Sequence, residues 1–238
     1  MYRTKVLAAT LLVVGICAVP AAAQQQSLSL NVGWFSPTRT ADRVGGDTLV
    51  ANLFATSPYA LGFRISDFDN TTFGADWLFP LGDYWEAGVG VSYYAKTVPS
   101  FYLDLTDESG GDIRQNLRLK EVPVNASLRF LPFGRRFPVR PYLGLGVSVI
   151  PWRYSEVGDF VDNATPPNIY SADYHDSGVT FGWTLMAGVR VPVTRAVSFG
   201  GEVRYLNAST TLDPSVGFLG DRLDLGGISY LATFNIKF

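Results

Sequence analysis

The chain has 238 residues, a formal net charge of −2, 47% hydrophobic residues and 14% aromatic residues. Its near-neutral balance predicts no nucleic-acid partner, because proteins that bind nucleic acids carry an excess of basic side chains. The single cysteine, Cys17, lies close to the N-terminus, which excludes a disulfide framework from the rest of the chain.

The N-terminal segment has the layout of an export signal. Arg3 and Lys5 precede an apolar run over residues 6–19, and small residues follow it. This run is shorter than the ~20 residues of a membrane-spanning helix. The layout therefore predicts a signal peptide over residues 1–23 that is cleaved on export. The remaining residues, 24–238, are predicted to form one all-β domain.

Eight later segments alternate apolar residues with small or polar ones, as strands with two unlike faces do. In chain order they cover residues 27–34, 72–79, 85–93, 122–130, 142–149, 179–190, 197–204 and 227–238. Single-chain bacterial barrels have an even number of antiparallel strands, which fits this count. Pro123 and Pro141 fall inside two segments, and we expect a local bulge at each because proline cannot donate to the ladder.

The connections between these segments alternate between short and long. The short ones cover residues 80–83, 132–138 and 192–195, and the long ones cover residues 37–62, 97–115, 153–176 and 208–221. Outer-membrane barrels have short turns on the periplasmic side and long loops outside. The sequence therefore predicts an eight-stranded, antiparallel, up-and-down transmembrane β-barrel with short periplasmic turns and long extracellular loops.

The apolar face of the strands distinguishes a membrane barrel from a soluble one. A soluble lipocalin-type barrel, the alternative, packs its large apolar side chains inside. Eight strands enclose a lumen that side chains already fill, and this face carries too many large side chains to fit there. We expect six side chains to mark the lipid-facing surface: Leu143, Leu145, Trp183, Leu185, Phe234 and Ile236.

The opposite face carries charged side chains that the same register turns into the lumen: Asp76, Glu86, Arg129, Arg140, Arg190, Glu202, Arg204 and Lys237. Buried ions cost several kcal/mol each unless they are paired. The sequence therefore predicts an ion-pair network, with Glu86 beside Arg129 and a cation between Asp76 and Glu86. Most of these charges lie near the short turns, which predicts a closed periplasmic half. Small residues line the other half, which predicts at most a blind pocket open to the outside.

Three stretches resemble the small outer-membrane β-barrel proteins of the OmpA/OmpW-like group. They are the alternating ending at 230–238, the stretch at 140–146 and the segment at 202–205, and the resemblance extends over residues 27–238. It implies a signal for the barrel-assembly machinery at Tyr230, Phe234, Ile236 and Phe238. We further expect a monomer surrounded by outer-membrane lipids and lipopolysaccharide.

The fold alone does not decide the function. The first hypothesis is a non-enzymatic outer-membrane protein that contributes to envelope structure or surface interaction through its loops. The alternative, implied by the OmpW side of the resemblance, is passage of small apolar molecules. A lesser alternative is a lipid A-modifying enzyme using His175 and Ser177, but their surroundings differ from the deacylase pattern and supply no clear triad. The sequence predicts no catalytic, metal or cofactor site.

Overall fold

The computed structural model describes residues 26–162, 164 and 167–238, so the predicted signal peptide over residues 1–23 lies outside the described part. The strands are β1 (Ser27–Pro37), β2 (Asn70–Leu81), β3 (Trp85–Thr106), β4 (Asp112–Glu121), β5 (Val124–Phe130), β6 (Arg140–Val161), β7 (Ile169–Pro192), β8 (Val197–Thr211), β9 (Arg222–Asp224) and β10 (Gly227–Lys237). Three short helical segments are η1 (Thr40–Asp42), α2 (Thr48–Leu53) and η2 (Ile65–Phe68). Within these residues, no helix has the length and apolar character needed to cross a membrane.

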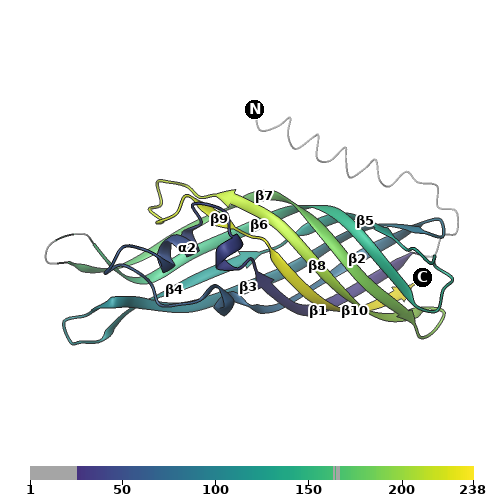
Figure 1. Cartoon of the computed structure of the whole chain (residues 1–238), viewed down its shortest axis with the longest axis horizontal. Coiled ribbons are helices and arrows are strands. Elements are labelled where there is room, and N and C mark those ends of the chain that lie inside the picture. The colour runs from purple at the N-terminus through teal and green to yellow at the C-terminus, as the bar shows by residue number, and fades with distance from the viewer. Residues whose placement is uncertain (1–25, 163, 165–166) are drawn as a thin grey trace, which may run out of the picture.

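The strands form one antiparallel sheet that closes into a ring (Figure 1). β4 and β5 both pair with β3 and with β6, so they are two parts of one strand, and β9 and β10 both pair with β8. β10 also pairs with β1, which closes the ring. The chain therefore occupies eight positions around the barrel, which confirms the predicted fold class.

The outer wall carries the predicted lipid-facing residues. Leu143 and Leu145 on β6 are 62% and 61% exposed, and Trp183, Leu185 and Ile236 are also exposed. Phe234 lies on the same face of β10 as Ile236 and packs against Phe199 of β8. Such a continuous apolar surface is stable only in lipid, so these residues define the membrane-spanning belt of the barrel.

The sheet continues far beyond this belt at the end of the molecule opposite the C-terminus (Figure 1). The predicted long loops at 97–115 and 153–176 are mostly strand, because β3 and β4 extend to residues 106 and 112, and β6 and β7 extend to residues 161 and 169. The long connections lie at one end of the barrel as predicted, but two of them are extended hairpins. Several of their inward-facing side chains, among them Val98, Leu117 and Tyr154, belong to one hydrophobic cluster, which favours continued strand pairing.

The two prolines do not produce the expected bulges. Pairing with β3 and β6 has the same register on both sides of Pro123, from Glu121 to Val124. The Val122 amide still donates to the Pro151 carbonyl at 2.9 Å. Pro141 lies in an uninterrupted ladder with β7 and beyond the end of β5, so its missing amide breaks no pairing with that strand.

Candidate functional site

The lumen is the candidate site, and its periplasmic half holds six of the eight charged residues expected there. We call them the ion-pair layer: Asp76, Glu86, Arg129, Arg190, Glu202 and Arg204. Each residue projects from a strand into the barrel, and most are almost fully buried. Three carboxylates and three guanidinium groups face one another there, so their charges balance.

Arg129 of β5 is at the centre of this layer. Its Nη2 atom lies 3.1 Å from Asp76 Oδ2 and 3.5 Å from Glu202 Oε2. Arg204 of β8 contacts the same two acids, at 3.0 Å from Asp76 Oδ2 and 2.7 Å from Glu202 Oε1. Two acids and two arginines from β2, β5 and β8 thus form one bonded cluster across the lumen.

Glu86 has a different partner from the one expected. It is the register neighbour of Arg129, but its carboxylate pairs with Arg190 of β7, whose Nη1 atom lies 3.0 Å from Oε1. Arg129 turns toward Asp76 and Glu202 instead, where it meets two carboxylates rather than one. The Asp76 carboxylate is held by Arg129 and Arg204, and no single cation is bonded to both Asp76 and Glu86 among the described residues.

Tyr142 of β6 joins the two parts of the ion-pair layer, although its sequence position gave no sign of this role. Its hydroxyl donates to Glu202 Oε2 at 2.7 Å, and its ring lies against the guanidinium groups of Arg129 and Arg190 at 5.2 and 5.4 Å. The ring requires Gly188 on β7, because a Cβ atom there would lie 2.5 Å from Tyr142 Cζ.

The two remaining charged residues lie outside the bonded network. Arg140 is half-buried, and its Nε atom donates to the Phe137 carbonyl at 3.1 Å. Lys237 is half-buried near the end of β10. Within the described ranges, neither has a carboxylate at ion-pair distance. Both lie at the periplasmic end of the barrel rather than in its bonded centre.

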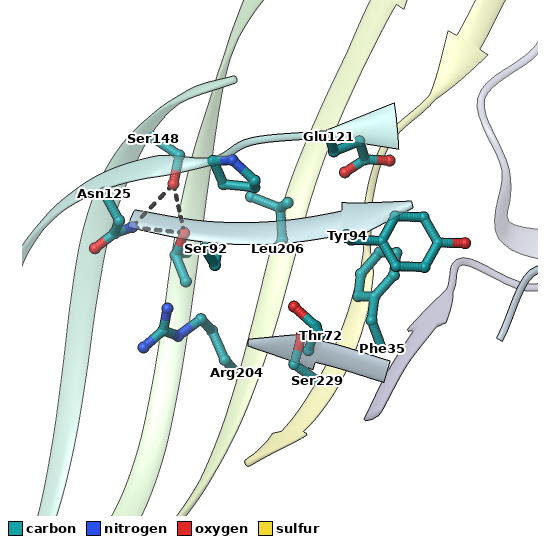
Figure 2. Close-up of a pocket in the computed structure, with 12 residues that line it drawn as sticks. Phe35, Thr72, Ser92, Tyr94, Glu121, Asn125, Ser148, Arg204, Leu206 and Ser229 are labelled. Carbon is teal, nitrogen blue, oxygen red and sulfur yellow. Dashed lines mark hydrogen bonds between the residues drawn. The ribbon is translucent and has the colours of Figure 1, made fainter. Parts of the chain in front are cut away.

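A small cavity lies above the ion-pair layer, between β1, β3, β5 and β8 (Figure 2). Its volume is about 30 Å³, which is room for about one water molecule. Asn125 on one side donates to the hydroxyls of Ser148 and Thr184, both at 2.9 Å. Phe35 and Leu206 line its outer side, among other residues.

This cavity is much smaller than the blind pocket that was the most the glycines of the lumen would allow. The side chains of neighbouring strands occupy the space that the glycines leave. A Cβ atom on Gly90 would lie 1.8 Å from Asp76 Oδ1, and one on Gly146 would lie 2.8 Å from Asn125 Oδ1. The glycines therefore make room for polar side chains instead of leaving the lumen open, and the space that remains lies within the predicted limit of at most a blind pocket.

The outer half of the lumen is filled by a hydrophobic core that the alternation of the strands did not predict. Here the connection over residues 38–69, which we call the first outer segment, packs inside the barrel. Leu49 of α2 and Phe68 of η2 are fully buried against inward-facing side chains of β3, β4, β6 and β8. Tyr94 of β3 also donates a hydrogen bond to the Phe68 carbonyl. We call this cluster the outer core.

The sequence contained a signal for the outer core. Apolar residues on β4, such as Leu117 and Leu119, point inward, whereas those on β5, such as Val124, point outward. The register is continuous through this phase change, so no bulge causes it. The phase change marks the height at which the surroundings of the barrel change from lipid to water. Apolar side chains point outward where lipid surrounds the wall and inward where water does.

A buried polar cluster fixes the first outer segment to the barrel wall. Asp47 caps α2 by accepting from the Leu49 and Val50 amides, and Arg43 donates to both of its oxygens at 2.9 Å. Arg43 also donates to the Asp224 carbonyl of β9 at 2.8 Å, and the Asp224 amide donates to Asp47 at 2.7 Å. The side chains of Arg43 and Asp47 are fully buried.

A second polar contact joins the first outer segment to β6. Asn52 of α2 donates to Glu156 Oε1 at 2.7 Å, and the Tyr154 hydroxyl donates to the same oxygen at 2.7 Å. Burial raises the pKa of the Glu156 carboxyl, and these two hydrogen bonds offset only part of that shift. Together, the two polar contacts hold the first outer segment at both ends of α2.

The enzymatic candidate residues lie on the outer wall of the barrel. His175 is in β7, opposite Ser155 of β6, rather than in the loop expected from the sequence. Its Nδ1 atom lies 3.6 Å from Asp173 Oδ1, and both side chains are exposed. In the part of the chain that the structure describes, no three potential metal ligands are grouped together.

The proposed assembly-signal residues lie on the last strand or directly after it. Tyr230 and Ile236 are exposed on the outward face of β10. Phe238 follows the strand and packs edge-on against Trp77 of β2, with ring centroids 6.0 Å apart. Their role in assembly stays a prediction.

Comparisons with known proteins agree with this geometry. Residues 9–234 match the family model of the outer membrane protein beta-barrel domain. No curated protein matches the chain. Among solved structures, a major outer membrane protein from Thermus thermophilus is similar, with a TM-score of 0.50 and 11% identity over 91% of this chain and 100% of that one.

Two further solved structures have a weaker likeness. Neisserial surface protein A has a TM-score of 0.45 and 12% identity over 90% of this chain and 97% of its own. Outer Membrane Protein W from E. coli has a TM-score of 0.41 and 16% identity over 91% of this chain and 100% of its own. Because the family model spans nearly the whole chain, the protein belongs to the outer membrane protein beta-barrel family and is located in the outer membrane.

Proposed function

We propose that this protein is a sealed, non-enzymatic outer-membrane barrel that contributes to envelope structure and surface interaction rather than to passage. The observation that carries this proposal is the filled lumen. A solute on a straight path would have to displace the outer core first and the paired charges of the ion-pair layer next. Separating buried ion pairs costs several kcal/mol, because each charge then lacks both its partner and water.

The hairpins beyond the membrane support a role at the cell surface. From Val149 at the edge of the belt, β6 continues as paired strand to Val161. At about 3.3 Å per residue, this extension is about 40 Å long, measured along the strand. The tips of the β3–β4 and β6–β7 hairpins border a cleft of about 590 Å³ whose lining includes Leu105 and Ile169. The barrel thus extends paired strands, and not only loops, beyond the membrane-spanning belt.

Passage of small apolar molecules would require the outer core to open. Leu49 and Phe68 would have to leave the lumen, and the Arg43–Asp47 pair would have to separate from β9. The contacts of the first outer segment therefore favour the sealed barrel over the passage alternative.

Reconstitution of the purified chain tests the proposal. In planar bilayers we expect no steady conductance, and in vesicles we expect an alkane to enter no faster than in protein-free vesicles. Asp47→Asn, which weakens the attachment of the first outer segment, serves as a comparison that should leak more than the wild type. Ohmic conductance or faster alkane entry with the wild-type protein would overturn the sealed barrel in favour of passage. A changed mass of lipid A after incubation with the protein would contradict the non-enzymatic part.

A further inference from the structure

Three cations form a patch on the outer wall of the barrel, which we call the basic patch: Arg118, Lys120 and Arg153. Lys120 of β4 and Arg153 of β6 are direct partners across the ladder. Arg118 lies two residues from Lys120 on the same face of β4. Arg118 and Arg153 are exposed and Lys120 is half-buried, so all three are accessible from outside the barrel.

The basic patch has no neutralising partner within the described residues. Like charges directly opposite each other in a sheet repel and destabilise the pair. None of the three has a carboxylate within 4.0 Å among the described side chains. By contrast, Arg114 on the same face of β4 is paired with Asp112 at 2.9 Å. An anion from outside the chain would remove the repulsion at the basic patch.

The height of the basic patch identifies the surroundings of that anion. On β6, and on β5, which continues the line of β4, the apolar belt begins only a few residues away, at Val149 and Val124, which are partners across the ladder. Lys120 Nζ also lies 5.4 Å from the ring centroid of Tyr93 on β3. Aromatic rings of membrane barrels gather at the headgroup level. The basic patch therefore lies at the headgroups of the outer leaflet.

We propose that the basic patch binds a phosphate group of a phosphorylated outer-leaflet lipid. Arginine offers a planar pair of donors that matches phosphate oxygens, and lysine adds a compact positive charge. The acyl chains of such a lipid would lie along the apolar belt directly below, beside Val124 and Val149. A free anion would interact only with the positive charges, whereas a lipid would also contact the apolar belt. The combination of charge and apolar surface therefore favours an amphiphile over inorganic phosphate.

The test compares the full chain in detergent micelles with lipid A, with dephosphorylated lipid A and with inorganic phosphate. Ligand binding to the folded state raises the apparent Tm. We expect lipid A to raise it for the wild type, and the other two probes to have little effect. The triple variant Arg118→Gln, Lys120→Gln and Arg153→Gln should bind lipid A at least tenfold more weakly. The control Arg114→Gln, in which the replaced cation is already paired, should bind like the wild type.

Two results would overturn the proposal. Equal binding of lipid A by the triple variant and the wild type would show that the basic patch is not the site. An equal Tm shift with inorganic phosphate would show a free-anion site rather than a lipid site. Heat-modified migration in gels, measured for every variant, reports whether each barrel is folded, and the single variant Arg153→Gln provides a milder test if the triple variant folds poorly. Lipid binding at the basic patch is independent of whether the lumen conducts ions.

Discussion

Replacing Arg129 with methionine should destabilise the barrel strongly, because it leaves the ion-pair layer with one surplus negative charge. The Arg129 side chain is 1% exposed and contacts both Asp76 and Glu202. Removing one partner of a buried ion pair costs about 3–5 kcal/mol. Arg204 keeps its contacts with both acids, so we expect a loss near the lower end, about 3 kcal/mol.

Urea unfolding of the protein in lipid vesicles, followed by tryptophan fluorescence, measures this loss. The double variant Arg129→Met, Glu202→Gln is the matched control, because it removes one charge of each sign and restores the balance. It should recover at least half of the lost unfolding free energy. A loss below about 1 kcal/mol for the single variant, as for an exposed pair, or a double variant less stable than the single one, would refute the charge-balance argument.

Three further predictions concern other parts of the chain. Leu145→Arg puts a charge on the lipid-facing wall and should lower the unfolding free energy in vesicles by about 2–4 kcal/mol. Burial raises the folded-state pKa of Glu156, so its contribution to stability should decline as the pH rises from its ordinary pKa of 4.5 through the raised value. Glu156→Gln should remove this decline, which unfolding at pH 4 and pH 8 measures. Mass spectrometry of membrane-extracted protein should find Gln24 at the N-terminus, and intact Met1 would contradict the predicted signal peptide.

The membrane-facing half of the fold was predictable from the sequence, because only one simple rule governs it. In that half, a strand residue faces either lipid or a narrow lumen, so apolar side chains alternate with small or polar ones. This alternation, together with the narrow lumen of eight strands, predicted that Leu143, Leu145 and Trp183 lie on the outer wall. The same register placed Asp76 and Glu202 inside the barrel.

The partners within the lumen were harder to predict. Ladder neighbours follow from the sequence once the turns are known, and Glu86 and Arg129 are indeed neighbours. The Glu86–Arg190 pair joins β3 to β7 across the lumen, so it depends on how the sheet closes. Closure sets the tilt and stagger of the strands, which no single hairpin determines.

The outer core was missed because a period of two shows which residues share a face, but not what surrounds that face. On β6 the inward positions change from Gly146 and Ser148 to Ile150 and Trp152, with no change of register. A single strand is therefore surrounded by lipid along one part of its length and by water along the next. The same switch occurs between β4 and β5, on either side of Pro123, and the continuous pairing excludes the bulge that was expected there.

In both halves of the barrel, the same packing that folds the chain also closes the lumen. Where lipid surrounds the wall, apolar side chains face outward and the lumen must hold polar groups, which pair with one another. Where water surrounds the wall, apolar side chains turn inward, and they gain free energy only if something covers them. The first outer segment supplies that cover through Leu49 and Phe68. Opening the lumen would expose the outer core to water, so the hydrophobic effect that folds the outer half also keeps it closed.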